Sequence, residues 1–206
     1  MPTAAAHTPV TTWVENPRGG RERGARGLAR AWLEVLVRPR RFFENGVAPG
    51  DQAPGLVFAV AMAVAYAVLL AVLDPARFPA TGALRAAVAV ALVALLVAPA
   101  VLHLLAALQT LTLMAFVRDR AGVSETVQVL AYATAPCPLA AVPSPELALL
   151  GCLYGSALLV VGLVTVHRTT TGRAVLAAAL PGSLLFGYGF GGIDALTALL
   201  RAWYII

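Results

Sequence analysis

The sequence predicts an all-α integral membrane protein, a five-helix transmembrane bundle with amphipathic interfacial helices at both ends. The chain of 206 residues is 60% hydrophobic and only 12% charged, whereas a soluble domain is about 45–50% apolar and about 25% charged. The apolar excess lies in long runs of Ala, Val and Leu between residues 55 and 192. Such runs are typical of helices that cross a bilayer. We therefore expect a five-span membrane domain over residues 55–192.

The regions that flank this domain differ from it in composition. Residues 1–25 are rich in Thr, Pro, Gly and Arg, which predicts a disordered basic arm. The arm lacks the apolar core of a cleaved signal peptide, so we expect the first span to direct the chain to the membrane. Residues 26–54 are expected to form a cytoplasmic amphipathic helix and loop, and residues 193–206 an interfacial tail.

A helical period runs through residues 26–38, "RGLARAWLEVLVR". The apolar residues at this spacing are Leu28, Trp32, Val35 and Leu36. The opposite face carries Arg26, Arg30 and Glu34. A helix with Trp on its apolar face and Arg on its polar face is typical of a membrane interface. Pro39 is expected to end it, because the residue before a proline is disfavoured in helical conformation.

Directly after this helix, arginines stand beside phenylalanines in "RPRRFF". Headgroups and acyl chains adjoin at a membrane surface, so we expect the arginines to hold lipid phosphates and the aromatic rings to enter the acyl boundary. The predicted lipid-interface residues are Trp32, Arg38, Arg40, Arg41, Phe42 and Phe43. The implied partners are anionic lipid headgroups and not nucleic acid.

Five apolar segments make up the predicted membrane domain. They are residues 56–73, 83–117, 126–142, 147–166 and 174–190. The second segment would measure about 52 Å as one helix, against about 30 Å of hydrocarbon. It is therefore either one long tilted helix bent near Pro99 or two spans.

The arginines favour the five-span alternative. All fifteen basic residues are arginine. With a cytoplasmic N-terminus, five spans place twelve of them inside and three outside, whereas six spans place nine inside and six outside. The positive-inside rule therefore favours five spans in the cell membrane. The loops around Asp119 and His167 then lie in the cytoplasm, and Glu146 and the C-terminal tail lie outside.

The tail contains a second helical pattern. Its apolar positions share one face: Ile193, Leu196, Leu200 and Trp203. The tail is too short to span a bilayer and carries Arg201 in its middle. We therefore expect a second interfacial helix here.

Few residues offer chemistry. No carboxylate pair, Ser/His/Asp set or metal-ligand spacing converges in the sequence, so we expect no enzyme, no catalytic residue, no metal and no cofactor. The alternative is a small-molecule or ion channel or transporter. It would use the helix break at Pro136 and Pro138 together with His103, although few ionisable groups lie within the spans.

Three stretches resemble, in order, the Yip family of multi-pass membrane proteins. "LVRPRRFF" looks like that family's Pro-x-x-Phe-Phe signature, and "SETVQVLAYATAPCPLAAVP" resembles its third span. "LLVVGLVTVHRTTTGRAVLAAALP" is similar to the segment that joins its last two spans. The matching motif residues are Pro39, Tyr132, Pro136, Gly162, His167 and Arg173.

The resemblance implies five spans, a cytoplasmic N-terminus and no catalytic residues. Eukaryotic members bind Rab-type GTPases and each other in vesicle traffic, and this chain looks like the prokaryotic branch. Its arm lacks the acidic Asp-Tyr type motif of the eukaryotic members, so GTPase binding stays open. We expect a non-enzymatic Yip-type protein that organises the membrane or scaffolds partners through its cytoplasmic face. A protein partner or self-association in the membrane stays open.

Overall fold

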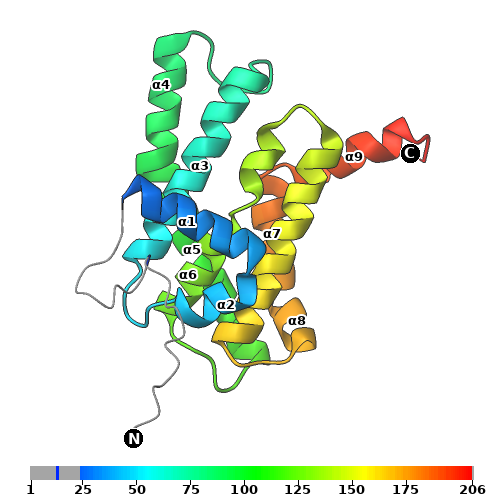
Figure 1. The fold of residues 1–206 in the computed structure, drawn as a ribbon. Helices are drawn as coiled ribbons and strands as arrows, with labels where there is room; N and C mark the ends of the chain where they lie inside the picture. The colour runs from blue at the N-terminus through cyan, green and yellow to red at the C-terminus, as the bar shows by residue number, and fades with distance from the viewer. Residues whose placement is uncertain (1–12, 14–23, 206) are drawn as a thin grey trace, which may run out of the picture.

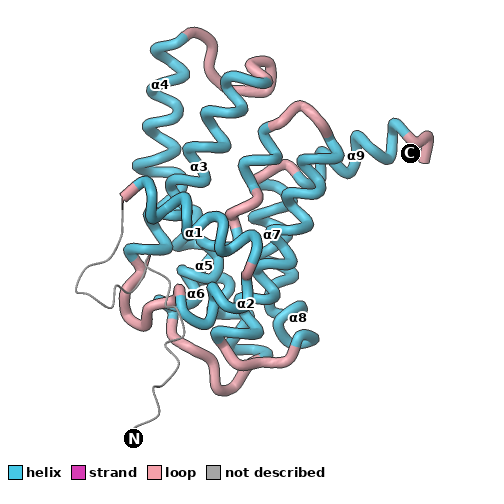
Figure 2. The backbone as a smooth tube through the Cα atoms, viewed as in Figure 1, coloured by secondary structure: helices cyan, strands magenta, loops and turns pink. Residues whose placement is uncertain are grey.

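The computed structural model describes residue 13 and residues 24–205, and all regular elements among them are helical (Figures 1 and 2). The α-helices are α1 (Ala25–Val37), α2 (Pro39–Asn45), α3 (Ala53–Leu73), α4 (Ala83–Leu92), α5 (Ala98–Phe116), α6 (Val123–Ala133), α7 (Pro145–Val166), α8 (Thr171–Gly182) and α9 (Gly192–Ala202). Two π-helical segments, η1 (Val93–Val97) and η3 (Ser183–Gly189), and the 3₁₀ segment η2 (Cys137–Ala141) complete the set. The predicted all-α class is confirmed, while most of the predicted disordered arm lies outside the described residues.

Among the described residues, three helices are long and apolar enough to cross a membrane. They are Ala53–Leu73, Ala83–Phe116 and Pro145–Val166. A pair bent by 69°, Thr171–Gly189 and Gly192–Ala202, forms a fourth span if it counts as one. The chain is therefore membrane-embedded, but the predicted count of five full-length spans is not confirmed.

The second predicted span is one continuous helix of 34 residues, Ala83–Phe116. This answers the question that the sequence left open. The π-helical η1 ends two residues before Pro99, which has no N–H to give to the turn before it. A widened turn is a common way for a long helix to accommodate such a defect.

The third predicted span, 126–142, is broken. The helix α6 ends at Ala133, and η2 takes over after a turn. Pro136 and Pro138 cause the break because neither can donate a backbone hydrogen bond. Every residue from 126 to 137 is buried, so the irregular backbone is covered by protein, as a membrane requires.

The loop before α3 is fixed to α6 by one buried side chain. The Gln128 amide donates to the carbonyl of Ala48 at 2.7 Å and accepts from its N–H at 3.0 Å. Gly55 lies so close that an added Cβ would come within 2.9 Å of Gln128. A glycine is therefore required where α3 passes α6.

Polar side chains also join α5 to α8. Pro181 lies inside α8, so the carbonyl of Ala177, four residues earlier, loses its usual helical donor. The side chains of Gln109 and Thr112 donate to this oxygen at 2.9 and 2.7 Å. Lipid could not satisfy the carbonyl, and α5 does so instead.

The chain turns sharply before its last helix. Gly191 adopts φ +75°, in the left-handed region that favours glycine, and α9 runs away from the bundle towards the C-terminus (Figure 1). Ala195 and Leu199 are buried, whereas Ile193, Leu196 and Trp203 of the predicted apolar face are exposed. An interfacial position of α9 stays a prediction.

Candidate functional site

One predicted motif residue, Tyr132, is completely buried in α6, and four aromatic side chains surround it. Phe42 packs edge-on against the Tyr132 ring at a centroid distance of 4.8 Å, and Phe58 packs similarly at 5.2 Å. Phe43 lies 6.4 Å away, centroid to centroid. The indole N–H of Trp13 donates to the Tyr132 hydroxyl at 3.2 Å. These five aromatic residues form the aromatic cluster.

The cluster corrects the prediction that Phe42 and Phe43 enter the acyl boundary. They are only 1% and 2% exposed, because α2 places both rings against the membrane domain. An added Cβ on Gly162 of α7 would come within 2.9 Å of the Phe43 ring. The Phe-Phe pair and Gly162 are thus complementary surfaces inside the protein, and these rings are not lipid anchors.

The rest of the predicted lipid interface lies around α1 and α2. The indole N–H of Trp32 donates to the carbonyl of Ala135 at 2.7 Å, an acceptor that the break after α6 leaves without its helical donor. Arg38 and Arg40 are exposed, and Arg41 is half-buried. Contact of Trp32 and these arginines with lipid stays a prediction.

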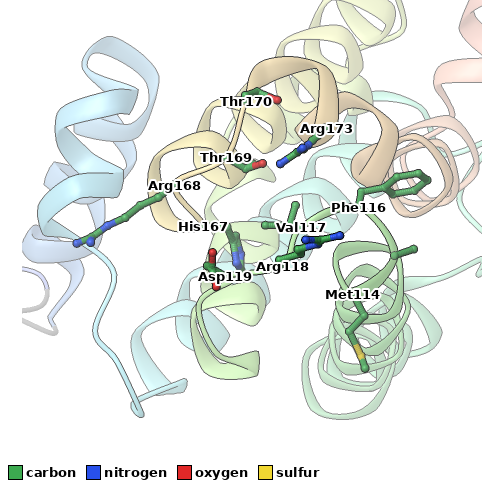
Figure 3. A pocket seen from close by; sticks show the side chains of 11 residues that line it. Met114, Phe116, Val117, Arg118, Asp119, His167, Arg168, Thr169, Thr170 and Arg173 are labelled. Carbon is green, nitrogen blue, oxygen red and sulfur yellow. The ribbon is translucent and has the colours of Figure 1, made fainter.

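The strongest candidate for a functional site is a polar pocket of about 770 Å³ between the loops that follow α5 and α7 (Figure 3). Its lining consists of residues 114–119, 167–170 and 173. Pockets of about 300–1,000 Å³ are typical of small-ligand sites. Two motif residues of the predicted set, His167 and Arg173, belong to this lining. We call it the loop pocket.

His167 joins the two loops. Its Nδ1 accepts the backbone N–H of Ala121 at 3.2 Å, so the proton of the neutral ring lies on Nε2. Burial, and to a smaller extent the charge of Arg120, lowers the pKa of His167 to about 4. The side chain is 1% exposed, and its Nε2 has no hydrogen-bond partner among the described residues.

The segment after α7 is held in an unusual backbone conformation. Arg168 adopts φ +49°, which is uncommon for a residue other than glycine. The chain turns there and leads into α8, whose N-cap residue, Thr170, makes no side-chain capping bond. The Thr169 hydroxyl is buried and has no partner in the described part of the chain.

Charge in the loop pocket is mainly positive. Arg118, Arg168 and Arg173 line it, against the single carboxylate of Asp119. Figure 3 shows Arg118 and Arg173 on the two sides of the space between the loops, while Arg168 turns away from it. The guanidinium groups of Arg118 and Arg173 therefore favour an anion in the pocket.

Other candidates from the sequence do not form a site. His103 is exposed on α5, where its Nε2 lies 3.3 Å from the Gln52 side chain and its Nδ1 lies 2.7 Å from the carbonyl of Pro99. Cys137 and Cys152 are free and buried. Across the residues that the structure describes, no group of three His, Cys, Asp or Glu side chains is placed to hold a metal.

Sequence reasoning missed three residues: Gln128, which joins α6 to the loop before α3, and Arg118 and Thr169, which line the loop pocket. Gln128 stands in the apolar run "VQVLAYA", and a lone amide among apolar residues is a signal of a buried polar contact. Thr169 and Arg118 carry no such signal, because their role depends on the meeting of two loops that are distant in the sequence.

The fold and its apolar helices define a multi-pass α-helical membrane protein. The chain belongs to the Yip family: the family described as "Yip1 domain" matches residues 33–193, more than half of its length. No curated protein and no solved structure matches it. The match includes every predicted motif residue, from Pro39 to Arg173.

Proposed function

We propose that this Yip-family protein is non-enzymatic and organises the membrane or scaffolds partners through the face that carries the loop pocket. The observation that carries the proposal is how the helices pack at the centre of the protein. The motif residues around Tyr132 and Gly162 are used to pack α2, α3, α6 and α7 together. The functional surface is therefore proposed to lie at the ends of the helices.

The proposed topology has five crossings, with α6 and η2 together as a short third crossing. The course of the chain in Figure 1 supports it, because α5 ends at the end of the bundle where α8 begins, and α7 begins at the opposite end. The segment between them, 117–144, must join those two ends. The arginine distribution supports a cytoplasmic loop pocket and an outer C-terminus. Location in the cell membrane and membership of the prokaryotic branch are further parts of this proposal.

Exposed arginines of α1 and α2 are proposed to lie at the same membrane surface. Arg26, Arg38 and Arg40 are exposed, while the Trp32 side of α1 packs on the protein core. Anionic headgroups would contact the outward charges only. Each basic group near an anionic surface contributes about 1 kcal/mol.

The channel or transporter alternative is not favoured. Pro136 is buried, and the break beside it is closed by Trp32 and by backbone hydrogen bonds. A cavity of about 310 Å³ that reaches Leu130 and Thr134 of this segment is lined mostly by apolar side chains of α3, η1, α5 and η3. A water-filled path would need polar groups there.

Site-specific photo-crosslinking in living cells tests the scaffold. A photoreactive residue at position 119 or 168 should give discrete adducts with the same partner, or with a second copy of the chain. The same residue at position 146, at the other end of the bundle, is the control. Equal adducts at all three positions, or none at 119 and 168, would contradict the proposal.

A further inference from the structure

Among the residues that the structure describes, the arginines of the loop pocket form no ion pair with an acid. Within the described residues, no ion pair joins Arg118 or Arg173 to a carboxylate, and the ion pair between Arg77 and Asp74 lies elsewhere. Both side chains are exposed, and they enter the pocket from two places, Arg118 from the loop after α5 and Arg173 from the first turn of α8 (Figure 3). Two guanidinium groups opposite one another suit an anion with several oxygen atoms.

Backbone dipoles add to this charge. The helix α8 begins at Thr171, and the N–H groups of its first turn have no acceptor within the helix. Its N-cap residue, Thr170, leaves them uncapped and lines the pocket together with Arg173. The positive end of this twelve-residue helix therefore lies at the pocket wall.

Two buried polar groups in the same wall have no partner. They are Nε2 of His167 and the hydroxyl of Thr169. Nε2 carries a proton, since Nδ1 accepts the Ala121 N–H. A buried donor without a partner is unfavourable, and in a native protein such a group calls for an explanation such as a bound ion or water.

We propose that the loop pocket binds a phosphate-bearing anion between Arg118 and Arg173, at the N-terminus of α8. The guanidinium groups would bind the phosphate oxygens, and a small shift of the loop would bring the Thr169 hydroxyl and His167 Nε2–H within hydrogen-bonding distance. The phosphate comes from a lipid headgroup or from a soluble phosphate. A headgroup fits the position, because the pocket lies where two membrane helices, α5 and α7, end.

This inference deepens the proposed function and rests on it, since it names what the scaffolding face binds. It is tested on the purified full chain without any partner protein. A negative result here therefore leaves the crosslinking result intact, and an absence of crosslinks leaves the binding result intact.

The experiment is titration calorimetry in a non-ionic detergent with inorganic phosphate and, separately, with glycerol 1-phosphate. We expect saturable binding. Arg118→Gln and Arg173→Gln should each weaken it by about tenfold to a hundredfold, as expected for a charge-assisted hydrogen bond. Arg168→Gln removes the same charge from a side chain that turns away, and should weaken binding by less than about threefold. Thermal unfolding of each variant shows that it is folded.

A second arm identifies the source of the phosphate. The protein in nanodiscs of phosphatidylcholine mixed with phosphatidylglycerol is analysed by native mass spectrometry for retained phosphatidylglycerol. Retention that falls in Arg173→Gln but not in Arg168→Gln assigns a lipid headgroup. Inorganic phosphate that binds as tightly as glycerol 1-phosphate, with no such lipid retention, assigns a soluble phosphate. No binding in either arm, or binding that Arg118→Gln and Arg173→Gln leave unchanged, overturns the proposal.

Discussion

The segment α6–η2 and the segment α4–η1 are both apolar and helical, yet they have opposite environments. In α6 every residue from Thr126 to Ala133 is buried. In α4 and η1 no residue is buried, and Leu95 is 82% exposed. Figure 1 shows α4 beside α3 at the margin of the molecule and α6 at its centre.

The difference teaches that hydropathy reports affinity for an apolar environment and not the source of that environment. Protein supplies it for α6, whose broken backbone needs hydrogen-bond partners. Lipid can supply it for α4, whose helical hydrogen bonds satisfy its backbone without neighbours. Polar and aromatic side chains are therefore concentrated on α6, as Tyr132 and Gln128 show.

Truncation of the central aromatic ring should give the largest effect. Tyr132→Ala removes a buried ring from the aromatic cluster and should reduce the free energy of unfolding by about 3–5 kcal/mol. Leu95→Ala, the matched change on η1, should alter it by less than about 0.5 kcal/mol. Unfolding in mixed detergent micelles measures both. Equal losses would remove the distinction between the two segments.

The pH dependence of the free energy of unfolding tests the hydrogen bond by which His167 holds the loop before α6. The folded-state pKa of about 4 lies below the ordinary value of about 6.5, so the unfolded chain binds the proton more readily. The stabilisation is therefore complete above pH 6.5 and is lost as the pH falls towards 4, by on the order of 3 kcal/mol. Unfolding curves across this range measure it.

The variant His167→Asn supplies the control for that pH dependence. Its amide oxygen can still accept the Ala121 N–H, but it does not titrate. The pH-dependent loss should then disappear between pH 6.5 and 4. A loss that persists in this variant would assign the effect to a carboxylate instead.

Loss of a single hydrogen bond at the helix break should have a smaller effect on the free energy of unfolding. Trp32→Phe retains an aromatic ring but leaves the carbonyl of Ala135 without its donor, and should reduce the free energy of unfolding by about 1–2 kcal/mol. Trp203→Phe changes a side chain that is 65% exposed and should have almost no effect. The same micelle unfolding assay compares them, and an equal response would show that the break needs no partner from α1.

The smallest effect is expected on the exposed face of α5. His103→Ala removes a hydrogen bond to Gln52, and such bonds between membrane helices average about 0.6 kcal/mol. The variant should fold and retain its crosslinked partners. If it folded normally but abolished a measurable transport of solute, the channel alternative would replace the scaffold.

The sequence predicted the elements better than their surroundings. The helical period at 26–38 and the apolar segments predicted α1, α3 and α7 to within a few residues, because these patterns depend on local spacing. The inward direction of Phe42 and Phe43 could not be predicted, since an aromatic pair beside arginines suits a lipid surface and a protein groove equally. What decides is Gly162, more than a hundred residues away, whose missing side chain leaves room for the Phe43 ring.

The candidate site was predicted only in part. The family resemblance selected His167 and Arg173, and the structure brings both into the loop pocket. Arg118 and Thr169 were not selected, because each looks like an ordinary loop residue until the loops that follow α5 and α7 are brought together. Contacts between distant loops depend on the packing of whole helices, which single-sequence patterns do not encode.

The π-helical η1 also makes the second long helix tolerant of a change in chain length at one place. A π turn holds about one residue more than an α turn, and one residue of an α-helix corresponds to a rotation of about 100°. Deletion of a single residue from Val93–Val97 would therefore convert the π turn into an α turn and leave α5 in register with α4. The same deletion in α5 shortly after Pro99 would rotate the residues that follow, and would carry Gln109 and Thr112 away from the Ala177 carbonyl that they satisfy. Natural variation in length should therefore gather in the loop 74–82 and at η1, and should avoid α5.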